Sequence, residues 1–84
     1  MSYTVYLLSE PRKHLPRIPK RDRERLYEAM RELAQNPRPP SCLKLEASEG
    51  WRLRVGDYRI VYLISDEEKT VTIVRVRHRS EAYR

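Results

Sequence analysis

Arginines and apolar residues alternate along the segment 51–62, and this pattern places cations together on one side of a predicted β-hairpin. Arg52 and Arg54 stand two apart in one predicted strand, so both point away from Leu53. Arg59 follows the Gly-Asp turn in the returning strand. A planar guanidinium group donates paired hydrogen bonds to phosphate oxygens. We therefore expect the hairpin to present arginines to a polyanion from a packed scaffold.

The overall charge also indicates an acidic partner. The 84 residues include 18 lysines and arginines against 12 aspartates and glutamates, which gives a formal net charge of +6. Beyond residue 50 the charges on the predicted strands are almost all positive, and the acidic residues 66–68 fall in a predicted turn. Arg75 and Arg77 share one side of the last predicted strand. For this pair, a solvated surface and an RNA-binding track fit the pattern equally well.

Arginine and tyrosine are the residues left to carry out a reaction. The sequence has no glycine-rich phosphate loop, no cluster of metal ligands, and no serine or cysteine beside a plausible base. Cys42 is the single cysteine, and His14 lies in an element unrelated to that of His78. We therefore expect neither a metal nor a cofactor. Such residues suit phosphodiester cleavage by an RNA 2′-hydroxyl, in which guanidinium groups neutralise the developing charge on the phosphorane.

Helices and strands that would position these residues are predicted from periodicity and from helix breakers. β-Branched and aromatic residues predict a strand over residues 3–8. Ser9 is expected to cap a short helix that ends before Leu15. A second helix is expected from residue 19 or 20 to about Gln35, before a proline-rich connector. Its apolar stripe consists of Leu26, Ala29, Met30, Leu33 and Ala34.

The second half of the chain predicts an antiparallel meander. Gly56-Asp57 is a two-residue loop that favours a type II′ turn, so Trp51–Val55 should pair with Tyr58–Ile64. Residues 43–50 fit either a loop or a short strand, and a last strand is expected over 70–77. One side of this last strand would carry Val71 and Ile73, and the other Thr72, Val74 and Val76. We therefore expect one α+β domain over residues 1–84, with an N-terminal strand, two helices of which the first is short, and an antiparallel β-meander.

Three motifs make the chain resemble a known family. They are the helix end Glu32–Pro37, the hairpin Trp51–Tyr62 and the closing segment Val76–Tyr83. Together they resemble the RelE toxins of the RelE/ParE toxin–antitoxin superfamily. The resemblance implies a compact fold of the microbial ribonuclease type and metal-independent cleavage of messenger RNA in the ribosomal A site. It also implies a RelB-like antitoxin that neutralises the toxin and connects it to operator DNA.

The resemblance also assigns roles to individual residues. The basic residues of the family site fall on Arg52, Arg54, Arg59 and Arg79, and its late tyrosine on Tyr83. The first two are arginines where the well-studied pattern has lysine, and an arginine with a pKa above ~12 cannot act as a base. We therefore expect Arg52 and Arg54 to bind RNA phosphates and Arg59 to stabilise the transition state. Tyr83 would orient or deprotonate the 2′-hydroxyl, with neighbouring arginines lowering its pKa.

The group that assists the leaving 5′-oxygen has two candidates. Arg79 is the closer positional match to the family pattern, whereas His78 is chemically the better acid. The tail is shorter between the arginine and the tyrosine than in some members of the family, so either Arg79 or His78 could take this role.

Two other functions compete with the messenger-RNA endonuclease. One is a toxin of ParE type, which resembles the same fold but inhibits DNA gyrase by protein binding; the ParE branch generally lacks the basic and tyrosine residues retained here. The other is a plain nucleic-acid-binding module, although an RRM is disfavoured because no RNP-like motif is present. No segment approaches the roughly 18 apolar residues of a membrane span, so we expect a cytoplasmic protein without a membrane partner.

Overall fold

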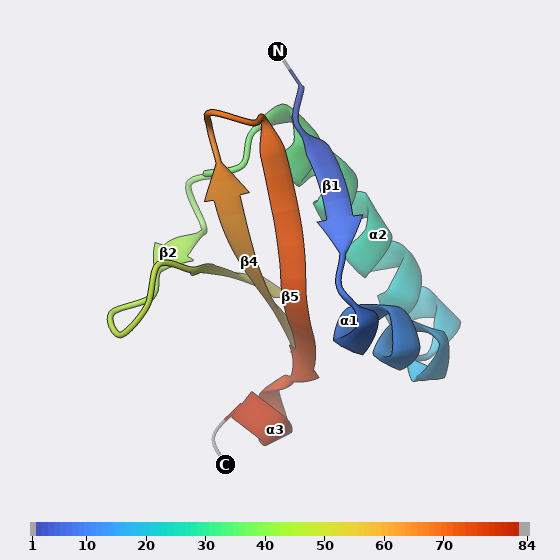
Figure 1. Ribbon diagram of the computed structural model, residues 1–84. Coiled ribbons are helices and arrows are strands. Elements are labelled where there is room, and N and C mark those ends of the chain that lie inside the picture. Colours follow the sequence, from blue (N-terminus) through green and yellow to red (C-terminus); the bar gives the residue numbers. More distant parts are fainter. Residues whose placement is uncertain (1, 83–84) are drawn as a thin grey trace.

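The computed structural model describes residues 2–82 and contains one five-stranded sheet in the order β1-β5-β4-β3-β2 (Figure 1). The strands are β1 (Thr4–Leu7), β2 (Leu43–Lys44), β3 (Trp51–Val55), β4 (Tyr58–Ser65) and β5 (Thr70–His78). The helices are α1 (Ser9–His14), the 3-10 helix η1 (Leu15–Arg17), α2 (Lys20–Gln35) and α3 (Arg79–Ala82). The expected α+β class is confirmed, and the ambiguous segment 43–50 contains a two-residue strand.

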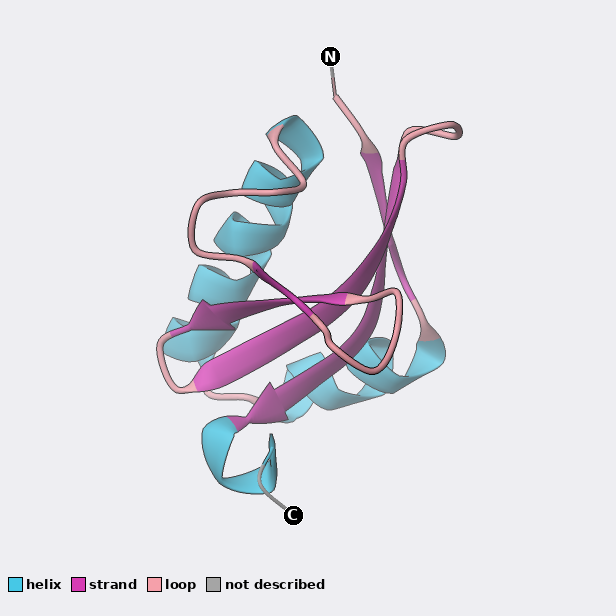
Figure 2. Cartoon of the chain, turned by 90° about the vertical axis from the view of Figure 1, so that its left-hand side faces the viewer, coloured by secondary structure: helices cyan, strands magenta, loops and turns pink. Residues whose placement is uncertain are grey.

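Helices α1 and α2 cover one face of the sheet and leave the other face open, and α3 lies beyond the end of β5 (Figure 1). From α2, Leu26, Met30 and Leu33 are buried, as the apolar stripe predicted. They meet an apolar surface contributed by β3, β4 and β5, which consists of Leu53, Ile60, Tyr62, Val71, Ile73 and Val76. Figure 2 shows the strong twist of this small sheet, with the long helix beside it. One hydrophobic core therefore supports all three long strands.

The boundary of α1 differs from the prediction. Ser9 is the first helical residue, Leu8 occupies the N-cap, and no side-chain hydrogen bond caps the helix. The predicted capping role of Ser9 is therefore wrong by one position. Pro11 lies in the first turn and is buried, so the helix still begins where proline is tolerated.

The β3–β4 hairpin has the predicted register. Val55 faces Tyr58 across the two-residue loop, and Gly56 has a φ of 60° whereas Asp57 does not have a positive φ. A positive φ at the first loop residue alone is the pattern of a type II′ turn. The guanidinium group of Arg25 on α2 lies against this turn, 3.3 Å from where a Cβ on Gly56 would stand.

A β-bulge in β5 changes which residues face the core. Val61 pairs with Arg75 but the next residue, Tyr62, pairs with Ile73, so Val74 is an extra residue in β5. Val71, Ile73 and Val76 are all buried, which makes the predicted placement of Val76 opposite the other two wrong. Simple alternation fails here because one unpaired residue shifts the pleat by one position. As a result, Arg75 and Arg77 lie on the open face.

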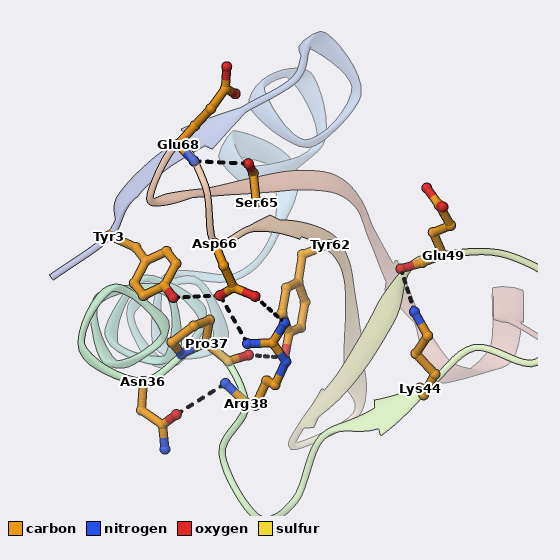
Figure 3. Close-up of polar contacts among 10 residues, drawn as sticks. All are labelled: Tyr3, Asn36, Pro37, Arg38, Lys44, Glu49, Tyr62, Ser65, Asp66 and Glu68. Carbon is orange, nitrogen blue, oxygen red and sulfur yellow. Dashed lines mark hydrogen bonds and ion pairs between the residues drawn. The ribbon is translucent and has the colours of Figure 1, made fainter. Parts of the chain in front are cut away.

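A polar network joins the proline-rich connector after α2 to the turn between β4 and β5 (Figure 3). Arg38 donates two hydrogen bonds to the Asp66 carboxylate at 3.1 and 2.8 Å, and the Tyr3 hydroxyl donates a third at 2.6 Å. These bonds lower the pKa of Asp66 to about 2. The Tyr62 hydroxyl donates to the carbonyl oxygen of Pro37 at 2.8 Å inside the core. The connector is thus attached to the middle of β4 through Tyr62 and to the turn after β4 through Asp66.

Candidate nucleic-acid interface and active site

Five arginines lie on the open face of the sheet, and we refer to them as the arginine face. They are Arg52, Arg54, Arg59, Arg75 and Arg77. Strand pairing arranges them in two cross-strand rows, in which neighbours on adjacent strands stand directly opposite each other. The first row consists of Arg54, Arg59 and Arg77, and the second of Arg52, Val61 and Arg75. The structure therefore combines the cations of the hairpin with those of β5, as the RNA-track interpretation requires.

A cavity of about 200 Å³ lies at the end of the sheet where the β3–β4 turn meets the end of β5. It is lined by Arg54, Asp57, Tyr58, Arg59, Arg79 and Ser80. Three of these side chains are guanidinium groups from three separate segments. The cavity volume is several times the ~30 Å³ that one water molecule takes up in the liquid. A phosphate group bound here would meet cations from β3, β4 and the start of α3.

Arg79 is held at this cavity by the turn. Its peptide N–H donates to the carbonyl oxygen of Asp57 at 2.7 Å, and its Nε lies 3.8 Å from Asp57 Oδ1. Arg54 Nε is 3.4 Å from the carbonyl oxygen of Gly56, so the same turn also orients the hairpin arginine. The resemblance placed Arg54, Arg59 and Arg79 in one site, and the structure brings these three together.

His78 is the last residue of β5 and lies on the core side of the sheet. It pairs with Tyr58 across β4 and β5, on the opposite side of the pleat from Arg77, and its ring makes an edge contact with that of Tyr58 at 5.2 Å. Its Nδ1 accepts the peptide N–H of Ser80 at 3.2 Å and lies 2.9 Å from the Ser80 hydroxyl oxygen. The imidazole does not line the cavity, whereas Arg79 does.

Tyr58 is a cavity residue that the sequence pattern did not single out. It alternates with Ile60 and Tyr62 on the core side of β4, and its side chain is half-buried. Burial raises the pKa of Tyr58, and the carboxylates of Asp22, Glu81 and Asp57 raise it further. The phenol therefore stays protonated at neutral pH and can act there as a hydrogen-bond donor. No sequence signal distinguishes this tyrosine, because only its position beside the turn exposes it to the cavity.

The other predicted site residues are placed less centrally. Arg52 is half-buried and Arg75 is exposed in the second row, at a distance from the cavity lining. Arg77 forms an ion pair with Glu10 of α1. Tyr83, the predicted base, lies outside the described residues.

The described residues contain neither a candidate metal site nor a membrane-spanning helix. Among residues 2–82, no group of three or more His, Cys, Asp or Glu side chains is arranged to hold a metal ion. None of the described helices is long and apolar enough to cross a membrane.

The sequence and the fold of this chain match those of toxins from type II toxin–antitoxin systems. Residues 7–83 match the model of the family described as "ParE toxin of type II toxin-antitoxin system, parDE". The chain belongs to this family, within the RelE/ParE superfamily. It is 37% identical over 86 residues to Toxin RelG of Mycobacterium tuberculosis, an alignment that covers 100% of this chain and 99% of the relative.

Solved structures with the same fold include RelE toxins in complex with antitoxins. The archaeal RelE–RelB complex from Pyrococcus horikoshii OT3 matches with a TM-score of 0.85 and 29% identity, over 94% of this chain and 97% of that one. The toxin–antitoxin complex RelBE2 of Mycobacterium tuberculosis matches with a TM-score of 0.80 and 34% identity, over 94% and 100%. The predicted RelE-like fold and family membership are confirmed.

Proposed function

We propose that this toxin is a ribosome-dependent endoribonuclease that cleaves messenger RNA in the ribosomal A site. The observation that carries the proposal is the convergence of Arg54, Arg59 and Arg79 on one cavity. Three fixed positive charges at one phosphate would stabilise a pentacoordinate phosphorane more strongly than the singly charged ground state. Relatives with 29% to 37% identity are RelE and RelG toxins, which favours this activity over gyrase inhibition of the ParE type.

The proposed reaction is an in-line displacement at phosphorus. The 2′-oxygen forms a new bond to phosphorus while the bond to the 5′-oxygen of the next nucleotide breaks. The 2′-hydroxyl proton passes to a base, and the leaving oxygen receives a proton. The products are a 2′,3′-cyclic phosphate and a free 5′-hydroxyl, so atoms and charge balance without a metal.

Each residue has a distinct part in this scheme. Arg52, Arg54 and Arg75 bind phosphates along the strand, and Arg59 stabilises the transition state. Tyr83 accepts the 2′-hydroxyl proton. Arg79 is proposed to stabilise the leaving oxygen by charge, because its guanidinium lines the cavity and cannot itself lose a proton at neutral pH.

The proton that the leaving oxygen receives needs a separate source. The protonated phenol of Tyr58 lines the cavity and can hydrogen-bond to that oxygen, or a solvent water can supply the proton. His78 remains the second candidate acid, but its ring would have to leave Ser80 and the edge of Tyr58 to reach the cavity.

We also propose a cognate RelB-like antitoxin as partner, in line with the RelE–RelB complexes among the solved relatives. An acidic or amphipathic segment would complement the arginine face. Operator DNA would bind through the antitoxin in this complex, and the ribosome with bound messenger RNA would be the target in the cytoplasm.

The test is to express the protein with and without its antitoxin and to map the 5′ ends of cellular messages. Arg59→Ala and Tyr83→Ala should abolish the cleavages, while circular dichroism shows a folded protein. Arg31→Ala is the matched control, because Arg31 is exposed on α2, away from the arginine face, and should leave cleavage unchanged. Persistent toxicity in the two active-site variants, with DNA breaks and intact messages, would overturn the proposal in favour of gyrase inhibition.

A further inference from the structure

Glu10 is an acidic residue that reaches the edge of the arginine face from α1. β1 pairs with β5 over Thr70 to Ile73 only, so the later part of β5 continues past the end of β1. At that point Glu10 Oε1 accepts the peptide N–H of Val76 at 3.5 Å, and Glu10 Oε2 forms an ion pair with Arg77 Nη1. One carboxylate therefore occupies the strand edge that β1 leaves open and also neutralises an arginine.

The ion pair directs Arg77 towards the edge of the sheet. The same Nη1 lies 3.3 Å from the carbonyl oxygen of Val76, which faces that edge. The side chains of Arg77 and Glu10 are 31% and 36% exposed, so water screens this pair less than a pair on the open surface. In the free protein, Arg77 is therefore already paired with the carboxylate of Glu10.

The position of Arg77 in the sheet explains why a counterion is needed there. It stands directly opposite Arg59, which stands directly opposite Arg54. Like charges opposite each other on neighbouring strands destabilise a sheet. A carboxylate at one end of the row offsets part of this repulsion.

We infer that Glu10 is the internal counterion of the row formed by Arg54, Arg59 and Arg77, and that an RNA phosphate replaces its carboxylate at Arg77 on binding. Glu10 is a positioning residue in this scheme, because it acts through Arg77 and does not touch the reacting atoms. The inference rests on the proposed function only in taking RNA as the ligand. It names a residue that sets how tightly that RNA binds.

The exchange has opposite consequences for stability and for binding. In the free protein the carboxylate stabilises the fold by reducing repulsion within the row. On binding, the carboxylate must be displaced before Arg77 can contact a phosphate, which weakens RNA affinity. A residue that only supported the structure would not produce this opposition.

The test uses Glu10→Gln, which keeps a carbonyl oxygen for the Val76 N–H but removes the charge. Binding is measured with a 2′-O-methyl RNA oligonucleotide, which cannot be cleaved by 2′-hydroxyl attack. We expect the variant to bind about two- to fivefold more tightly than wild type, the change that corresponds to losing one partly exposed ion pair. The slope of log K against log salt should stay about the same, because Arg77 contacts one phosphate in both proteins once the wild-type carboxylate has been displaced. The thermal midpoint should fall.

Two controls separate this effect from a general change in charge. Glu28→Gln removes a carboxylate that pairs with Arg31 at 2.6 Å on α2, so it should change neither affinity nor salt slope. In the Arg77→Gln background, Glu10→Gln should no longer tighten binding. Weaker or unchanged binding by Glu10→Gln, or an equal gain in the Arg77→Gln background, would overturn the inference.

The result can be distinguished from a failure of the proposed nuclease activity. A protein that binds the oligonucleotide with the expected Glu10 dependence but cleaves no messages would contradict the nuclease proposal and support the exchange. A protein that cleaves messages but binds the oligonucleotide equally well with and without the Glu10 carboxylate would support the nuclease proposal and contradict the exchange.

Discussion

The peptide N–H of Arg79 donates to the carbonyl oxygen of Asp57 at 2.7 Å, which joins the end of β5 to the β3–β4 turn. This hydrogen bond brings the tail of the chain to the hairpin arginines. It connects a backbone group with a backbone group, so it does not depend on the side chain at position 79. Substitutions of Arg79 can therefore test its chemistry without releasing the tail.

Arg79→Ala should reduce messenger-RNA cleavage by about 10²- to 10³-fold, the usual effect of losing one charge-stabilising group in an active site. His78→Gln should stay within severalfold of wild type, because the imidazole does not line the cavity. Cleavage by programmed ribosomes in vitro measures both variants. The reverse order of effects would make His78 the group that assists the leaving oxygen.

Deletion of Val74 should leave the protein folded with its arginines on the same face. Val74 is the extra residue of the bulge, so its removal makes the pairing of β5 with β4 continuous and preserves the facing of Ile73, Arg75 and Val76. Deletion of Thr72 is the control, because it would place the buried Val71 and Ile73 on opposite faces. Thermal unfolding should be cooperative for the first variant and absent for the second. Similar behaviour of both deletions would contradict this account of the bulge.

Asp66 should make stability depend on pH in the acid range. Its pKa is lowered from 3.8 to about 2, first by the hydrogen bond from Arg38 and then by that from Tyr3. A lowered native pKa means that the stabilisation is complete above the unfolded-state value and is lost as pH falls towards 2. Asp66→Asn should therefore have a lower unfolding midpoint than wild type at pH 7, with the difference shrinking between about pH 5 and pH 2. Glu67→Gln in the same turn should show no such trend.

Gly56→Ala should destabilise the hairpin. Gly56 has a φ of 60°, a region that costs an L-residue about 1–2 kcal/mol, and a Cβ there would stand 3.3 Å from Arg25 Nη1. Urea unfolding should report a loss of this size. In the Arg25→Ala background the loss should persist, because the backbone conformation is its main source. Full recovery in that background would show that the contact with Arg25, and not the φ angle, is responsible.

Local patterns in the sequence were sufficient for the elements and for most of the candidate site. Helix α2 spans Lys20–Gln35 as its apolar stripe and the following proline predicted, and the hairpin pairs across Gly56-Asp57 as its turn type required. These features depend on residues close together in the chain, so periodicity and turn propensity report them directly. The alternation of arginines in β3 belongs to the same category.

Contacts between distant segments decided those parts of the fold and of the candidate site that local patterns did not predict. The bulge at Val74 arises from pairing β5 with β4 and turns Val76 to the core side with Val71 and Ile73, whereas alternation within β5 placed it on the opposite side. The ion pair between Glu10 and Arg77, and the approach of Arg79 to the turn, join residues more than 20 positions apart. No local pattern encodes such pairs, because they form only when the sheet closes over its core. The sequence by itself determined a basic hairpin on an α+β scaffold, and the tertiary structure determined which arginines share one cavity and which carboxylate pairs with Arg77.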